Sequence, residues 1–92
     1  MSDITPLTPQ QVLLAAADLM EKRGKAIGRY WDATGRCCAL GAISIAASDW
    51  QAYDAAKELL HKHIDEDLSI PTWSDANDAA TVIAALRRAG GA

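Results

Sequence analysis

Residues 36–47 read Arg-Cys-Cys-Ala-Leu-Gly-Ala-Ile-Ser-Ile-Ala-Ala, and no charged side chain follows Arg36 within them. Because such a run has no charged face to turn toward water, we expect it to be buried and central to the fold. Its alanine content and the helix-start signal after it favour a helix of about three turns. Ile43 and Ile45 are β-branched and leave a buried strand as the alternative. Gly41 would let a neighbouring helix approach closely.

Length and composition indicate one small domain. The chain has 92 residues, half of them apolar, and lacks phenylalanine, so three tryptophans and two tyrosines supply its aromatic bulk. A chain of this size buries only about 60–65% of its unfolded surface on folding. We predict a flexible tail at residues 1–7 and a single domain at residues 8–92. Its predicted fold is all-α, a compact four-helix domain in which the uncharged stretch is the second helix.

The first helix begins at a complete capping signal. In Thr8-Pro9-Gln10-Gln11, the threonine would cap the helix, the proline would take the first helical position and the second glutamine would bond back to the cap. Gly24 would end the helix after Arg23. Apolar side chains recur between these limits at intervals of three and four residues, which predicts one buried stripe: Val12, Leu13, Ala16, Leu19 and Met20.

Residues 25–36 allow two interpretations. Asp32-Ala33-Thr34-Gly35 is a turn signature, and a short hairpin could form across it. An irregular connector held by the apolar side chains of Ile27, Tyr30 and Trp31 fits the sequence equally well. Both interpretations remain open from the sequence.

A third helix follows the central stretch. Ser48 and Gln51 fit a capping box, which predicts a helix over residues 49–64. Three acidic residues at positions 65–67 would end this helix, because the C-terminus of a helix carries a partial negative charge.

The last helix is predicted after a short loop. Residues 68–73 would form this loop, made rigid by Pro71. Asp75 or Asn77 would then cap the fourth helix, because both residue types are good N-caps. Gly90 would end it.

Charge argues against several ligand classes. The net charge is −3; residues 21–36 carry five basic and two acidic side chains, whereas residues 49–78 carry eight acidic and two basic ones. The acidic half disfavours nucleic-acid binding, and the basic cluster is best explained as a solvated face. The N-terminus lacks the segments of a signal peptide, and no apolar run approaches the ~20 residues of a membrane span. With no spaced cysteine pairs, we expect a cytoplasmic protein without a membrane partner.

Two segments, Gly35-Arg36-Cys37-Cys38-Ala39-Leu40-Gly41-Ala42-Ile43 and Trp73-Ser74-Asp75, stand out as motifs. They resemble a family of small uncharacterised actinobacterial and actinophage proteins with the motifs Gly-Arg-x-Cys-Ala-Leu-Gly-Ala and Trp-Asn-Asp. Ser74 departs from the second motif, where the family often has asparagine. The resemblance covers most of the chain and implies no assigned activity, cofactor or catalytic residue. It implies an actinobacterial setting with a phage or prophage origin, in which small proteins commonly bind a host factor.

Cys37 and Cys38 raise the alternative of a small cysteine- or metal-dependent enzyme that uses His61 and His63. A cysteine beside Arg36 at a helix N-terminus would gain thiolate character, and the thiolate is the nucleophile. Adjacent residues on a helix point about 100° apart, however, so neighbouring thiolates suit a tetrahedral ion poorly. We therefore expect no metal or other cofactor, and expect at least one cysteine to pack in the core.

Trp73, Asp75, Asn77 and Asp78 form the most distinctive polar cluster. Its carboxylates could hold a cation or form an acid–base pair, but capping of the last helix explains them better. Arg36 could pair with one of them and so join the loop to the central helix. We assign structural roles to Arg36, Cys37, Cys38, Gly41 and Asp75.

Aromatic side chains are the best candidates for a binding surface, because exposed aromatic residues dominate interface hot spots. The candidates for an interface are Trp31, Trp50, Tyr53 and Trp73. The sequence contains no complete catalytic set. The leading hypothesis is a non-enzymatic protein–protein interaction module that binds either a host factor or a second copy of itself.

Overall fold

The computed structural model describes residues 8–25, 38–64 and 67–91, and these form five helices. The predicted all-α class is confirmed, whereas the predicted number of four is wrong because the segment predicted as a loop contains a helix. No strand occurs in the described ranges. The predicted tail and, apart from Lys25, the possible hairpin at 25–36 lie outside them. The helices are α1 (Pro9–Arg23), α2 (Ala39–Ala46), α3 (Trp50–His61), α4 (Ile70–Ala76) and α5 (Ala79–Ala89).

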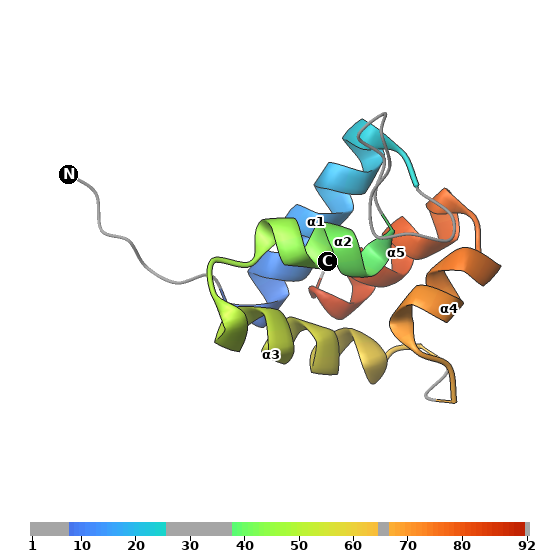
Figure 1. The fold of residues 1–92 in the computed structure, drawn as a ribbon. Helices are drawn as coiled ribbons and strands as arrows, with labels where there is room; N and C mark the ends of the chain where they lie inside the picture. Colours follow the sequence, from blue (N-terminus) through green and yellow to red (C-terminus); the bar gives the residue numbers. More distant parts are fainter. Residues whose placement is uncertain (1–7, 26–37, 65–66, 92) are drawn as a thin grey trace.

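The helices enclose one core. α1 packs against α2, α3 and α5, and α2 also contacts α3 and α4. Figure 1 shows α2 in front of α1 and α5, with α3 along the lower side and α4 on the right. None of the helices in the described part of the chain is long and apolar enough to cross a membrane. The largest fully buried side chains include Leu13, Met20, Ile43, Leu60 and Leu86.

The capping box predicted for the first helix is confirmed. The backbone N–H of Gln11 donates to Thr8 Oγ1 at 3.1 Å, and the backbone N–H of Thr8 donates to Gln11 Oε1 at 2.9 Å. Pro9 occupies the first turn, where its missing N–H removes no helical bond. α1 ends at Gly24, whose φ of 90° favours glycine.

The central stretch forms a shorter helix than predicted. α2 has eight residues, about two turns, and Cys38 is its N-cap. Residues 39–43 are buried, whereas Ser44 and Ile45 are exposed. The expectation of burial on all sides is therefore correct only for the first half of α2.

Two side chains satisfy the buried N-terminus of α2. Cys38 Sγ accepts a hydrogen bond from the backbone N–H of Gly41 at 3.5 Å. Ser74 Oγ, from α4, accepts one from the backbone N–H of Ala39 at 3.2 Å. The first N–H groups of a helix have no partner within it, so these bonds satisfy donors that burial would otherwise leave unpaired. Ser74 is itself fully buried.

Two caps differ from the prediction. Asp49, rather than Ser48, caps α3, and its Oδ1 accepts from the backbone N–H of Ala52 at 2.8 Å. Asp78, rather than Asp75 or Asn77, caps α5 by accepting from the backbone N–H of Thr81 at 2.8 Å. Each predicted cap lies within three residues of the true one, because several good capping residues follow one another at both sites.

α4 begins within the segment predicted to be a loop, residues 68–73, and extends beyond it. Ser69 caps it, with its Oγ accepting from the backbone N–H of Thr72 at 3.3 Å. Pro71 lies in the first turn, where proline favours rather than prevents a helix. Asp75 lies within α4, and Asn77 follows it as the C-cap.

Candidate interaction surface on α2 and α3

The most exposed large apolar side chain of the described residues is Trp50, at the first position of α3. Its relative exposure is 77%. The ring of Tyr53, one turn later, meets it edge to face, with 5.5 Å between ring centroids and an interplanar angle of 81°. Lys57 Nζ lies 4.7 Å from the centre of the Tyr53 ring, a cation–π contact. The spacing of these residues places them on one face of α3.

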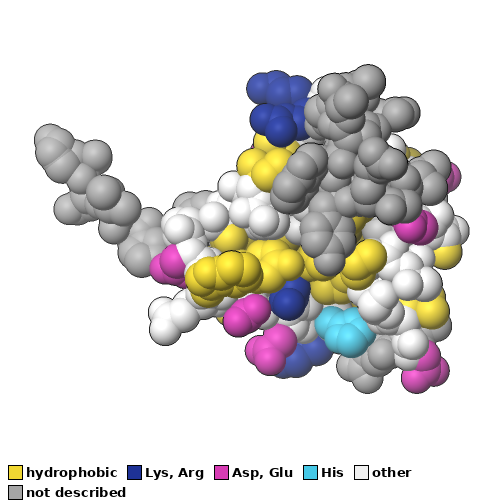
Figure 2. All heavy atoms as spheres, viewed as in Figure 1, with side chains coloured by type: hydrophobic (Ala, Val, Ile, Leu, Met, Phe, Trp, Pro, Cys, Tyr) yellow, Lys and Arg dark blue, Asp and Glu magenta, His cyan; other side chains and the backbone are white. Residues whose placement is uncertain are grey.

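Two hollows flank this face and form what we call the α2–α3 groove. The first has a volume of about 340 Å³ and is lined by Ser44, Ala47, Ser48, Asp49, Trp50 and Tyr53. Figure 2 shows a band of hydrophobic side chains across this side of the molecule, with acidic and basic side chains along its lower border. The second hollow, of about 440 Å³, extends to the start of α4 and is lined by Leu40, Lys57, Glu58, His61, Ser69, Ile70 and Pro71.

The charges beside the groove are only partly paired. Lys57 Nζ lies 3.7 Å from Asp54 Oδ1, so its charge is shared between that carboxylate and the Tyr53 ring. Glu58 forms no ion pair with a described residue, including Lys62 one turn further along the helix. The groove therefore has two aromatic side chains in its first hollow and, in its second, a carboxylate without an ion pair to a described residue.

Of the other predicted interface and structural residues, those that the structure describes do not line the groove. Trp73 is only 7% exposed and packs in the core from α4, so it adds no accessible surface. Gly41 is buried in α2, and Asp75 is exposed on α4. Trp31, Arg36 and Cys37 lie outside the described residues. The structure thus brings together two of the four aromatic candidates, Trp50 and Tyr53.

The polar groups of the enzyme alternative have structural contacts. Cys38 is 1% exposed and its sulfur caps α2. His61 Nε2 donates to the backbone carbonyl of Leu68 at 3.0 Å, and His63 Nδ1 donates to that of Leu59 at 3.0 Å. Within the described ranges, no group of three or more histidine, cysteine or carboxylate side chains could hold a metal ion.

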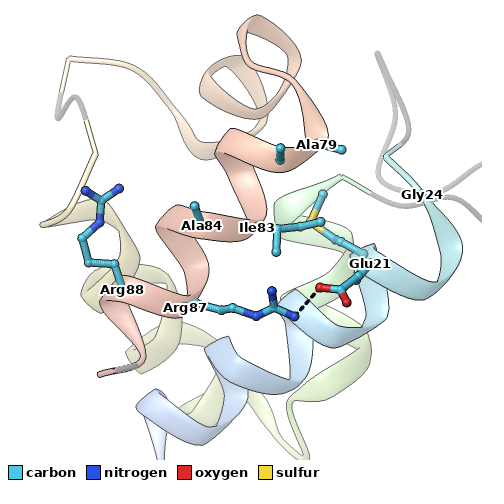
Figure 3. A pocket seen from close by; sticks show the side chains of 9 residues that line it. Glu21, Gly24, Ala79, Ile83, Ala84, Arg87 and Arg88 are labelled. Atoms are coloured by element: carbon cyan, nitrogen blue, oxygen red, sulfur yellow. Dashed lines mark hydrogen bonds and ion pairs between the residues drawn. The ribbon is translucent and has the colours of Figure 1, made fainter.

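A second, larger groove lies between α1 and α5. Its volume is about 940 Å³, and its lining includes Gly24, Ala79, Ile83 and Ala84. Figure 3 shows the Glu21–Arg87 ion pair beside these small apolar side chains. This groove was not predicted, although alanines on the outer face of α5 are a signal for it, because a small side chain leaves the neighbouring helix uncovered.

The Arg87 guanidinium joins the two helices at this groove. It donates to Glu21 Oε2 and lies 3.4 Å from Asp18 Oδ1, both on α1. The hydrogen bond to Glu21 raises the pKa of Arg87 above its ordinary value. Arg87 is therefore already paired within the protein, which leaves the apolar lining as the accessible part of this groove.

Residues 4–92 match a family of unknown function, DUF6197. The chain belongs to the DUF6197 family. No curated protein and no solved structure matches it. In this DUF6197 protein, the two sequence motifs meet through the hydrogen bond between Ala39 N–H and Ser74 Oγ. Through this hydrogen bond, Ala39 and Ser74 hold α2 against α4. Leu40 of α2 and Ile70 of α4 line the second hollow of the α2–α3 groove.

Proposed function

We propose that this DUF6197 protein is a non-enzymatic helical module that binds another protein through the α2–α3 groove. The observation that carries the proposal is the 77% exposure of Trp50 beside Tyr53. An exposed tryptophan beside a half-buried tyrosine is typical of an interaction surface, because these two residue types contribute much of the energy of protein interfaces. The Trp50 side chain is not needed to fill the core, whereas Tyr53 is half-buried and packs against it.

Helix capping accounts for the polar side chains that suggested chemistry. Cys38 and Asp78 each cap a helix, and Cys38 is buried. A cysteine nucleophile requires an accessible thiolate and a base within hydrogen-bond reach. Burial of the Cys38 sulfur and the carbonyl contacts of both histidines favour a structural role for these groups.

The resemblance drawn from the sequence suggests the class of partner. In a protein of phage or prophage origin, the occupant of the groove would be a host factor. A second copy of the chain is the other candidate, and its binding would appear as concentration-dependent dimerisation.

Capture experiments with two single variants test the proposal. Trp50→Ala removes the exposed indole, whereas Gln51→Ala changes an exposed neighbour that points about 100° away on the helix. If burial of Trp50 contributes about 2 kcal/mol, its loss weakens binding about thirty-fold. We expect wild type and Gln51→Ala to retain the same protein from an actinobacterial lysate, and Trp50→Ala to lose it.

Sedimentation of wild type, Trp50→Ala and Gln51→Ala over a range of concentrations tests whether the protein binds a second copy of itself. Capture that is equal for Trp50→Ala and wild type would contradict the proposal. So would the absence of any captured protein together with a monomer at all concentrations. Thermal unfolding by circular dichroism verifies that both variants remain folded.

A further inference from the structure

The residues that line the α2–α3 groove indicate what kind of protein segment would bind there. This inference rests on the proposed function. We propose that the occupant is an amphipathic helix with basic residues along one border: its apolar stripe covers Trp50 and Tyr53, and an arginine or lysine pairs with Glu58. Shape, charge and the exposed indole each support this assignment.

The length of the groove suits a short helix. Both hollows open along α3, the first beside Trp50 and the second beside His61. These positions are eleven residues apart, which at 1.5 Å per residue is about 16 Å, or three helical turns. Three turns present apolar anchors at positions i, i+3 or i+4, and i+7, the pattern by which an amphipathic helix binds a hydrophobic groove.

The charge at the groove favours a basic partner. Lys57 is already matched by Asp54 and by the Tyr53 ring, whereas Glu58 lines the second hollow without an ion pair to a described residue. A cation at this edge would be attracted to the Glu58 carboxylate, and an acidic partner would be repelled by it. The surrounding sequence strengthens the preference, since residues 49–78 carry eight acidic and two basic side chains.

Trp50 offers a second contact to a cation. Lys57 Nζ already lies over the face of the Tyr53 ring, so this helix contains one cation–π contact. The indole of Trp50 is the better ring for the same interaction, and its exposure leaves it accessible to a guanidinium. An arginine could therefore stack on Trp50 while the apolar stripe fills the hollows.

Selection from a random library of 16-residue displayed peptides identifies the chemistry of the occupant even while the natural partner is unidentified. We expect peptides enriched on wild type to carry an apolar stripe at helical spacing and arginine or lysine beside it. Binding by a synthetic copy of the strongest peptide should weaken about thirty-fold with Trp50→Ala. Proline placed in the middle of the peptide should abolish binding, because it breaks a helix.

Two variants that raise the net charge by the same amount separate local pairing from overall charge. Glu58→Gln removes the carboxylate in the groove, and Ala84→Lys adds a cation on α5, where it lines the other groove. We expect about three- to ten-fold weaker binding of the basic peptide with Glu58→Gln. Ala84→Lys should leave binding unchanged.

The outcomes distinguish this inference from the proposed function. Enriched peptides that need Trp50 but are neutral or acidic would overturn the basic partner and leave the interaction surface intact. Equal weakening by Ala84→Lys and Glu58→Gln would also overturn it. If none of the enriched peptides depends on Trp50, the proposed helical occupant is wrong. The lysate experiment independently decides whether the surface binds protein at all.

Discussion

Replacement of Ser74 by alanine tests how the two sequence motifs hold α2 in place. The Ser74 hydroxyl is fully buried and accepts from the backbone N–H of Ala39 at 3.2 Å. Without it, that N–H is buried at the start of α2 with no acceptor from α4. Leaving a buried donor unpaired costs about 1–3 kcal/mol. For a domain of this size, each kcal/mol lowers the melting temperature by about 4–8 °C.

The matched control is Ser44→Ala, which removes a hydroxyl from the exposed part of α2. Urea unfolding followed by far-ultraviolet circular dichroism measures the free energy of unfolding of both variants. We expect Ser74→Ala to lose about 1–3 kcal/mol and Ser44→Ala to change by less than about 0.5 kcal/mol. A Ser74→Ala protein as stable as the control would refute the proposed role of this hydrogen bond.

Three further predictions concern caps and the buried thiol. Thr8→Ala removes the capping box of α1 and should cost about 1 kcal/mol in the same urea assay; an unchanged midpoint would count against the cap. Hydrogen bonds from Thr81 lower the pKa of Asp78, so this carboxylate stabilises the fold above about pH 4 and the contribution is lost as pH falls further. Asp78→Asn should therefore reduce the acid sensitivity of the melting temperature, and an identical pH profile would contradict this. In a Cys37→Ser variant, Cys38 should react with iodoacetamide only as fast as the protein opens, whereas rapid alkylation of the folded protein would revive the enzyme alternative.

Local sequence signals predicted the start of a helix correctly where a single clear motif was present. The start of α1 was predictable because threonine, proline and glutamine each have one role at their positions. At α3, Ser48 and Asp49 are both good caps; the capping-box spacing of Ser48 and Gln51 favoured Ser48, whereas Asp49 caps the helix. α4 has seven residues, too few for apolar periodicity to identify, and Pro71 supports a helix start as well as a rigid loop.

The candidate site was harder to predict because it depends on packing. Ala39 and Ser74 are separated by 35 positions, and nothing local to either residue indicates that they meet. Tryptophans 50 and 73 are the same residue type, yet one is exposed and the other buried, a difference set by how α3 and α4 dock on the core. Both grooves arise from neighbouring helices and so appear only in the folded structure.

The central claim is that partners bind in the α2–α3 groove, and mapping of backbone amide chemical shifts tests it most directly. The ¹⁵N-labelled protein is titrated with the protein captured from lysate or, separately, with the strongest selected peptide. We predict that the largest shifts fall on residues 40, 44–61 and 68–70, and that the α1–α5 groove around Ala84 is unaffected. Shifts centred on the α1–α5 groove, or the absence of any saturable shift, would contradict the claim.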